Sequence, residues 1–415
     1  MNGMQGYAQH DFAKMAPDRL SRPMLILVMG LLGTSYMFNA MDRQVFPSLL
    51  SAIRTTYGLS LAQAGFVSTV FTFSVAIVGP VAGWFYARYT RKSILVGGLI
   101  GYSVFTLITP LAQGFTTLAA FRGLTGVGEA LQVGAVYCCL GGYFGRTRGA
   151  AMGWMQAFFG FGALVGPVIG VHLHRAFGQW ELPFYVFGVA GIVVALLLAR
   201  FMPGRFSEAI EPAERTGIFE KAPSLPRLLN RNVCLASASF ALVGLSFFSY
   251  TALYATYLRE HLNYTSVAAG SALGMYGLGA MGAVIGGWAG DRLGKAGIFC
   301  GLAILAAASF LMFNGTVQPL AHAGLSLLFG LMVSGFFYAR FVSVIQRSAH
   351  PLQIGYAVSA AMTGFYMSGP FAGFLFGELV ELWGWSAAAN VMVVAPPCVA
   401  MVLMAFFDYS RLRDA

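Results

Sequence analysis

Apolar runs of about 20 residues recur along almost the whole chain, from Pro23 to Phe407. A helix of that length crosses roughly 30 Å of hydrocarbon. Only 10% of the residues are charged, whereas soluble domains carry roughly 25%. The sequence therefore predicts an all-α integral membrane protein. We place its twelve transmembrane helices at 23–47, 60–84, 92–113, 115–140, 149–174, 182–203, 231–257, 265–290, 295–315, 321–346, 354–380 and 385–407.

The segments outside these runs are short and polar. Residues 1–22 lack the apolar core and the small-residue cleavage site of a signal peptide, so we expect the first run to remain as a helix. The predicted organisation is an N-terminal segment (1–22), a six-helix bundle (23–203), a linker (204–230), a second six-helix bundle (231–407) and a tail (408–415).

The net charge of +10 is distributed by side of the membrane. If both termini are cytoplasmic, nineteen Lys and Arg residues fall in cytoplasmic segments, and only Arg54, Arg175 and Arg259 fall on the other side. Basic loops stay on the cytoplasmic side during insertion. We therefore expect a multi-pass protein of the bacterial inner membrane with cytoplasmic N- and C-termini. The positive charge indicates topology and no nucleic-acid partner.

The two halves of the chain repeat each other. Gly83-Trp84 in the second predicted helix corresponds to Gly287-Trp288 in the eighth, 204 residues later. Pro167 in the fifth helix and Pro370 in the eleventh share the pattern Gly-Pro-x-x-Gly and lie 203 residues apart. Two matches at nearly one offset indicate two bundles of the same orientation, related by an axis along the membrane normal.

Several motifs resemble those of the major facilitator superfamily of secondary transporters. The motif "G-x-x-x-D-R-x-G-K" (Gly287, Asp291, Arg292, Gly294, Lys295) follows the eighth helix. Three stretches are similar to the Spinster branch, namely "NAMDRQVFPSLLSAI" (39–53), "RGLTGVGEA" (122–130) and "GPVIG" (166–170). The anion symporter branch also carries an Asp-Arg pair near the first of these. The resemblance implies a two-bundle transporter that works by alternating access.

The resemblance also implies a cytoplasmic gate. In the family, an acidic residue of the loop after the second helix caps a facing helix, but this chain has Ala87 there and keeps only Asp291. A carboxylate at a helix N-terminus stabilises it by typically 0.3–1 kcal/mol. We expect a gate formed by Arg88, Asp291, Arg292 and Arg146 that closes mainly through Asp291. The alternative is that Ala87 has no consequence.

Four charged residues fall inside predicted helices of the first half: Asp42, Arg43, Arg122 and Glu129. A charge at a helix centre costs roughly 2.5–3.5 kcal/mol, so such groups usually pair or face a cavity. Arg122 and Glu129 are seven residues apart, about 10.5 Å along a helix, which is too far for direct pairing. We therefore expect a net-neutral cluster with Asp42 and Arg43 that faces a central cavity.

Such a cluster can couple protons to transport. Burial favours the neutral form of a carboxyl group, and a neighbouring arginine favours the charged form. A conformational change that moves the arginine can therefore make Glu129 or Asp42 bind or release a proton. Spinster-like proteins are thought to use the matching acidic residues in this way. Arg43 and Arg122 are the charge partners and could hold a substrate anion. The alternative is a fixed network that only stabilises the bundle.

Four further polar or aromatic residues are candidates for lining the cavity: Asn39, Gln156, Tyr250 and Arg340. Tyr250 belongs to an aromatic stripe that is equally consistent with core packing. Arg340 could instead extend to the membrane surface. In the fifth helix, Gly162, Gly166, Pro167 and Gly170 form a motif that allows a helix to bend.

No catalytic constellation stands out, and the five cysteines show no metal-ligand spacing. We therefore expect no enzymatic activity, no cofactor and no metal. The partners expected are membrane lipids, protons and a small amphiphilic or organic-anion substrate, bound by a monomer. The Spinster resemblance implies lysophospholipids or sphingoid lipids. The anion symporter branch implies small organic carboxylates.

Overall fold

The computed structural model describes residues 20–86, 88–144, 148–209, 230–349 and 354–412. These residues form helices and short connections, and they include no β-strand. The first half contains α2 (Arg22–Tyr57), α3 (Leu61–Thr69), α4 (Phe71–Tyr86), α5 (Arg91–Ile108), η1 (Thr109–Leu111), α6 (Phe115–Phe144), α7 (Arg148–Phe177), α8 (Leu182–Phe201) and α9 (Gly204–Ser207). Together α3 and α4 form the second span.

The second half repeats this pattern with more interruptions. Its elements are α10 (Arg231–Thr256), η5 (Tyr257–His261), α11 (Ser266–Ala280), α12 (Ala283–Asn314), α13 (Pro319–Gly330), η6 (Leu331–Phe337), α14 (Tyr338–Ser348), α15 (Ile354–Ala389), η8 (Asn390–Val394), α16 (Ala395–Ala405) and η9 (Tyr409–Arg411). The π-helical segments η5, η6 and η8 continue the helices before them.

Two glycines turn the chain inside α12 and α15. Gly294 has φ 53° and Gly384 has φ 78°, a left-handed conformation that glycine adopts without a Cβ penalty. Each of the two elements therefore contains the end of one span and the start of the next. Counted in this way, the described residues form twelve membrane-length spans, as the sequence predicts. By length and composition, ten helical stretches of the described residues could cross a membrane, and one of them, Tyr356–Ala405, holds two spans.

The first helix is longer than predicted. The predicted span, which rests on the length of an apolar run, ends at 47, and proline stands at this position. In the structure α2 continues through Pro47 to Tyr57. Neighbouring membrane helices can support such an interruption. The helix ends at Gly58, which has φ 61° and whose backbone N–H donates to the carbonyl of Arg54.

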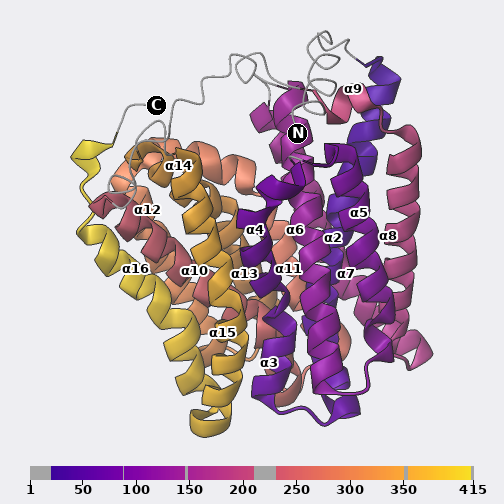
Figure 1. The fold of residues 1–415 in the computed structure, drawn as a ribbon. Helices are drawn as coiled ribbons and strands as arrows, with labels where there is room; N and C mark the ends of the chain where they lie inside the picture. Colours follow the sequence, from indigo (N-terminus) through magenta and orange to yellow (C-terminus); the bar gives the residue numbers. More distant parts are fainter. Residues whose placement is uncertain (1–19, 87, 145–147, 210–229, 350–353, 413–415) are drawn as a thin grey trace.

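The helices form two bundles that stand side by side (Figure 1). One contains α2 to α8, and the other contains α10 to α16. We call the side on which α2 begins and α9 lies the α9 side, and the side on which α3 begins the α3 side. The spans of both bundles run between these two sides (Figure 1).

Glycines bring the bundles into close contact on the α3 side. Gly65 of α3 lies against Gly373 of α15, where an added Cβ would meet the carbonyl carbon of Gly373 at 2.6 Å. Gly277 of α11 lies against the backbone of Gly160 and Leu164 in α7. Backbones approach this closely only where a side chain is missing. The two bundles are therefore sealed together on this side.

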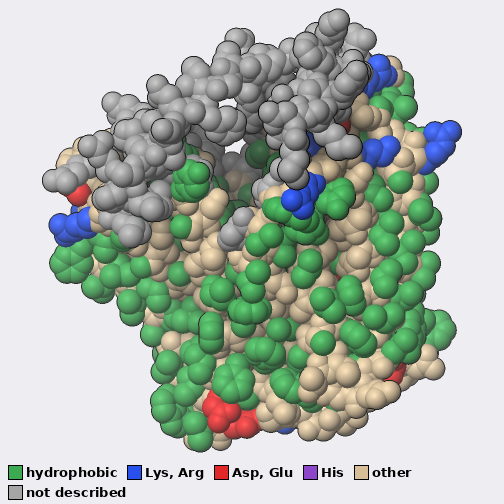
Figure 2. All heavy atoms as spheres, in the orientation of Figure 1, with side chains coloured by type: hydrophobic (Ala, Val, Ile, Leu, Met, Phe, Trp, Pro, Cys, Tyr) green, Lys and Arg blue, Asp and Glu red, His purple; other side chains and the backbone are tan. Residues whose placement is uncertain are grey.

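Two polar contacts add to the seal. Arg54 Nη1 lies 2.5 Å from Glu260 Oε2, which joins the end of α2 to η5. The backbone N–H of Leu61, at the start of α3, donates to Glu381 Oε1 of α15 at 2.6 Å. We call these two contacts the α3-side latch. Toward the α9 side the bundles separate, and the surface is hollowed between them (Figure 2).

Candidate functional site

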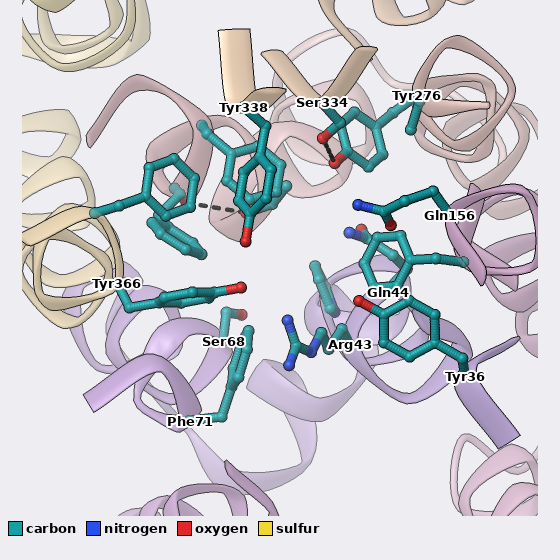
Figure 3. Close-up of a pocket in the computed structure, with 17 residues that line it drawn as sticks. Tyr36, Arg43, Gln44, Ser68, Phe71, Gln156, Tyr276, Ser334, Tyr338 and Tyr366 are labelled. Carbon is teal, nitrogen blue, oxygen red and sulfur yellow. Dashed lines mark hydrogen bonds between the residues drawn. The ribbon is translucent and has the colours of Figure 1, made fainter. Parts of the chain in front are cut away.

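A pocket lies between the two bundles, on the α9 side of the glycine contacts (Figure 3). Its cavity volume is about 70 Å³, so the pocket is narrow at this depth. It shares lining residues with two wider cavities of about 1070 and 300 Å³ toward the α9 side. The pocket is thus closed toward the α3 side and continuous with space on the α9 side.

The two bundles contribute different chemistry to this pocket. The second bundle provides an aromatic wall, in which Phe247 stacks near Phe365 with ring centres 6.2 Å apart. Tyr276 belongs to the same wall, and its hydroxyl bonds to Ser334 at 2.5 Å. The first bundle provides Arg43, Gln44 and other polar side chains. Such a pocket suits a ligand with one apolar and one charged part.

Arg43 is the charged side chain among the residues that line the pocket. Its Nε donates to Glu129 Oε2 at 2.7 Å, and 11% of its side chain is exposed. In Figure 3 its two terminal nitrogens point into the opening. A guanidinium fork of this kind can bind a carboxylate or a phosphate through two parallel hydrogen bonds.

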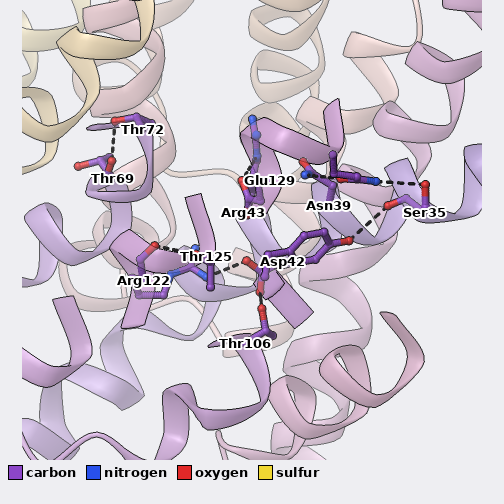
Figure 4. A network of polar contacts seen from close by, with 12 residues as sticks. Ser35, Asn39, Asp42, Arg43, Thr69, Thr72, Thr106, Arg122, Thr125 and Glu129 are labelled. Carbon is purple, nitrogen blue, oxygen red and sulfur yellow. Dashed lines mark hydrogen bonds and ion pairs between the residues drawn. The ribbon is translucent and has the colours of Figure 1, made fainter. Parts of the chain in front are cut away.

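A second ion pair lies behind Arg43 (Figure 4). Arg122 Nη1 donates to Asp42 Oδ2 at 2.8 Å, and Thr106 Oγ1 donates to Asp42 Oδ1 at 2.7 Å. Asp42 and Arg43 are neighbours on α2, whereas Arg122 and Glu129 both lie on α6. The two pairs therefore join α2 to α6 twice, and the four charges cancel.

The position of this cluster corrects one expectation. All four charges were expected to face the central cavity, but Asp42, Arg122 and Glu129 are at most 1% exposed. Successive residues of a helix point about 100° apart, so Asp42 turns into the bundle toward Thr106 of α5 while Arg43 turns outward. Only Arg43 of the four lines the pocket.

The Phe71 ring lies close to the guanidinium groups of both Arg43 and Arg122. Its ring centre lies 5.2 Å from the Arg43 guanidinium carbon and 5.9 Å from that of Arg122. Arg122 also lies 4.9 Å from the ring centre of Phe46. Distances within about 6 Å allow cation–π attraction. Phe71 is the first residue of α4, directly after the break in the second span at Val70.

Asn39 lies inside the first bundle and not on the pocket. It is fully buried, and its Nδ2 donates to Gln132 Oε1 at 3.0 Å. Gln132 Nε2 in turn donates to Ser35 Oγ at 3.1 Å. One turn of α2 separates Asn39 from Arg43, but the side chain meets α6 instead of the opening. This chain of hydrogen bonds joins the same two helices as the ion pairs.

Tyr250 and Arg340 also lie away from the pocket, while Gln156 lines it. Tyr250 is fully buried in the second bundle, where its hydroxyl bonds to Ser326 at 2.5 Å and its ring stacks on Phe329. The core-packing alternative therefore describes Tyr250. Arg340 is 5% exposed and donates to the carbonyl of Gly294 at 3.3 Å, so it supports the turn between two spans.

The glycines of the fifth-helix motif serve close packing between α7 and α2. Gly162 lies against the backbone of Met37, and an added Cβ at Gly166 would meet the Met41 Cα at 2.8 Å. Gly170 lies against the side chain of Val45. With Pro167 inside, α7 remains one helix from Arg148 to Phe177. Bending at this motif stays a prediction.

The predicted gate falls largely outside what the structure describes. Arg146 and Ala87 lie outside the described residues, and the side chains of Asp291 and Arg292 are also not described. Arg88 is exposed, with its guanidinium carbon 4.2 Å from the ring centre of Trp84.

Sequence reasoning missed several residues of the pocket. Gln44, Ser68, Tyr338 and Tyr366 all line it. Gln44 could have been found, because it is a polar residue beside Arg43 within an apolar run. A serine or tyrosine in a membrane helix gives no comparable signal. Among the described residues, no group of three or more His, Cys, Asp and Glu side chains converges as metal ligands.

Two helical bundles stand side by side around a pocket with a polar and an aromatic side, which is an arrangement found in membrane transporters. The chain belongs to the Major Facilitator Superfamily, whose family model matches residues 32–373. It is a multi-pass integral membrane protein of a transporter family. The expected fold and family are therefore confirmed.

Similar proteins place it near the Spinster branch. A bacterial homologue of the human lysosomal transporter Spinster, in an inward-facing and occupied conformation, superposes with a TM-score of 0.74 at 17% identity, covering 95% of this chain and 98% of that one. A sphingosine-1-phosphate transporter of Xenopus tropicalis is 27% identical over 42% of this chain and 34% of its own length. Spinster homologues of other vertebrates match as well. The resemblance to this branch is thus confirmed.

A further relative is described by a different substrate. A probable 4-methylmuconolactone transporter of Cupriavidus pinatubonensis is 30% identical over 57% of this chain and 55% of its own length. The chain thus spans between 34% and 55% of the length of these two curated relatives.

Proposed function

We propose that the protein is a secondary transporter that carries an amphiphilic anion by alternating access, coupled to protons. The observation that carries the proposal is the position of Arg43. It pairs with a buried carboxylate through Nε and presents its terminal nitrogens to a pocket between the bundles (Figure 3). A pocket of this kind binds the anionic group of a substrate at the arginine.

The aromatic wall favours an amphiphile over a small polar anion. Phe247, Phe248 and Phe365 line the side of the pocket that faces the second bundle, and aromatic rings bind apolar chains through large contact areas. The similarity to a sphingosine-1-phosphate transporter supports the same class. The similarity to a 4-methylmuconolactone transporter supports a second candidate, a small organic carboxylate, which would use the same arginine.

Proton coupling follows from competition for Arg43. Glu129 is fully buried, its Oε2 accepts from Arg43, and its Oε1 has no hydrogen-bond partner within the described residues. A substrate anion that draws the guanidinium into the pocket leaves the Glu129 carboxylate without its counter-charge. Isolated buried charges are costly, so Glu129 then binds a proton.

This competition indicates whether the proton and the anion move in the same direction or in opposite directions. Protonated Glu129 and the bound anion stabilise each other, and such coupling is reciprocal between the two ligands. We therefore infer that proton and anion move together, as in symport. Asp42 has both oxygens engaged by Arg122 and Thr106, whereas Glu129 Oε1 has no partner within the described residues, so we assign proton exchange to Glu129.

The wide cavities on the α9 side connect the pocket to that side of the protein. With both termini in the cytoplasm, as the distribution of basic residues indicates, the α9 side is cytoplasmic and the conformation is open to the cytoplasm.

The test is uptake into proteoliposomes under an imposed pH gradient, with a lysophospholipid and a small carboxylate compared side by side. We expect wild type to take up the lysophospholipid and Arg43→Met to lose most of this uptake, with an unchanged melting temperature as the control for folding. Uptake of the carboxylate alone would instead favour the second candidate. No proton-dependent uptake of either would refute the proposal.

A further inference from the structure

Two buried polar atoms of the pocket lack a hydrogen-bond partner within the described residues, and the proposed binding of an anion by Arg43 does not use them. Gln44 is 4% exposed and Ser68 is 2% exposed, and both line the pocket. Gln44 Oε1 and Ser68 Oγ are buried and have no hydrogen-bond partner within the described residues. An unsatisfied buried polar group costs about 1–3 kcal/mol, so the fold carries these two groups at a disadvantage.

Other hydroxyl groups in and beside the pocket do have hydrogen-bond partners. Thr69, the residue after Ser68, donates to the carbonyl of Gly65 at 3.0 Å, which is the common way for a hydroxyl in a helix to satisfy itself. Thr251 of the pocket donates to Phe248 in the same manner. Ser334 is paired with Tyr276.

The geometry of the pocket places these two groups around Arg43. In Figure 3, Ser68 lies on one side of the Arg43 guanidinium and Gln44 lies on the other. Gln44 follows Arg43 on α2, whereas Ser68 lies on α3, two residues before the break at Val70. A ligand whose anionic group binds Arg43 would therefore bring its adjacent atoms next to an unpaired amide and an unpaired hydroxyl.

We propose that Gln44 and Ser68 form a hydroxyl subsite, which recognises a hydroxyl group adjacent to the anionic group of the substrate. This inference rests on the proposed function and narrows its substrate class. A hydroxyl both donates and accepts, so it can satisfy Gln44 Oε1 on one side of Arg43 or Ser68 Oγ on the other. An ammonium group offers no acceptor and would place a second positive charge beside Arg43.

The test compares ligand pairs that differ only in this hydroxyl. For a lipid substrate the pair is 1-oleoyl-lysophosphatidate and its 2-deoxy analogue. For a small carboxylate it is 3-hydroxybutyrate and butyrate. We expect wild type to take up the hydroxylated member with a kcat/KM about tenfold higher, because a site built to bind a hydroxyl discriminates against an analogue that leaves its polar groups unpaired.

Two variants assign the preference to the subsite. At least one of Gln44→Met and Ser68→Ala should bring the ratio of kcat/KM between the hydroxylated and the deoxy member close to one. Ser249→Ala is the matched control, because Ser249 Oγ is also buried without a partner in the described residues but does not line the pocket. It should keep the full preference. Ser68→Ala keeps the test usable if Gln44→Met does not fold.

The outcomes separate the two proposals. Transport without preference for the hydroxyl, or a preference that both variants keep, would refute the subsite and leave the proposed function in place. Transport of no member of either pair would refute both. The pair that is transported identifies whether the hydroxyl belongs to a lipid head group or to a small acid.

Discussion

Arg43 Nε lies 2.7 Å from Glu129 Oε2, so the side chain that lines the pocket is also the counter-ion of a fully buried carboxylate. Its sequence neighbour Asp42 holds Arg122 at 2.8 Å on the other face of α2. A ligand at Arg43 would therefore contact one member of a buried ion pair, and the second pair begins at the adjacent residue of α2.

Replacing Glu129 by Gln should uncouple transport from protons. The amide cannot exchange a proton and places no negative charge beside Arg43, so it imitates the protonated form. Wild-type KM for the anion should rise as pH increases, because the ionised carboxylate competes with the substrate for Arg43. In Glu129→Gln the KM should be low and nearly independent of pH, while uptake driven by a pH gradient is lost and exchange across the membrane continues. A KM that varies with pH equally in both proteins would contradict this role.

Removing one member of the second ion pair should destabilise the protein. Asp42→Asn leaves the Arg122 charge fully buried without its counter-ion. Loss of one partner of a buried pair costs about 3–5 kcal/mol, which should appear as a lower melting temperature in detergent. The double variant Asp42→Asn with Arg122→Gln should recover much of this loss. If Asp42→Asn alone melts like wild type, the pair does not stabilise the bundle.

Phe71→Leu should weaken substrate binding more than it slows turnover. The ring touches both guanidinium groups, and each cation–π contact contributes about 0.5–2 kcal/mol. Without the ring, Arg43 is held less firmly, so KM should increase several-fold at a nearly constant kcat. Phe46→Leu is the control, because Phe46 contacts Arg122 and does not line the pocket. It should affect stability and leave KM unchanged.

Arg54→Gln should favour opening on the α3 side. The Arg54–Glu260 pair is about 30% exposed on both members, so its loss should change the free energy of unfolding by less than about 1 kcal/mol. Because the pair joins the two bundles, even this amount shifts the conformational equilibrium. The distance between spin labels at Thr55 and His261 should show a larger population of long separations. Arg259→Gln changes the same charge next to the latch and should leave the distance distribution as it is.

The fold could be predicted from the sequence because the membrane imposes one length and one kind of element on every span. Even the turns at Gly294 and Gly384 lie within a few residues of the predicted gaps at 290–295 and 380–385. The first helix extends to Tyr57, beyond the predicted end at 47, because an apolar run marks the part of a helix in hydrocarbon and not the turns beyond it.

The site was predicted in part. The four charges of the first bundle could be paired by their positions in α2 and α6, since charges in lipid need partners. Their orientation could not be predicted, because a rotation of α2 by one residue decides whether Asp42 or Arg43 meets the pocket. For the same reason the sequence left two alternatives open for Tyr250 and for Arg340, and the structure places Tyr250 in the core of the second bundle. Ser68 had no distinguishing signal, since its role depends on Arg43 lying beside it in space.

The contact between Gly65 and Gly373 has a consequence for how the transporter can move. Main chain lies directly on main chain there, so no rotamer change can make an opening for even a water molecule. The contact is made by backbone atoms on both sides. Opening on the α3 side therefore requires α3 and α15 to move apart as whole helices.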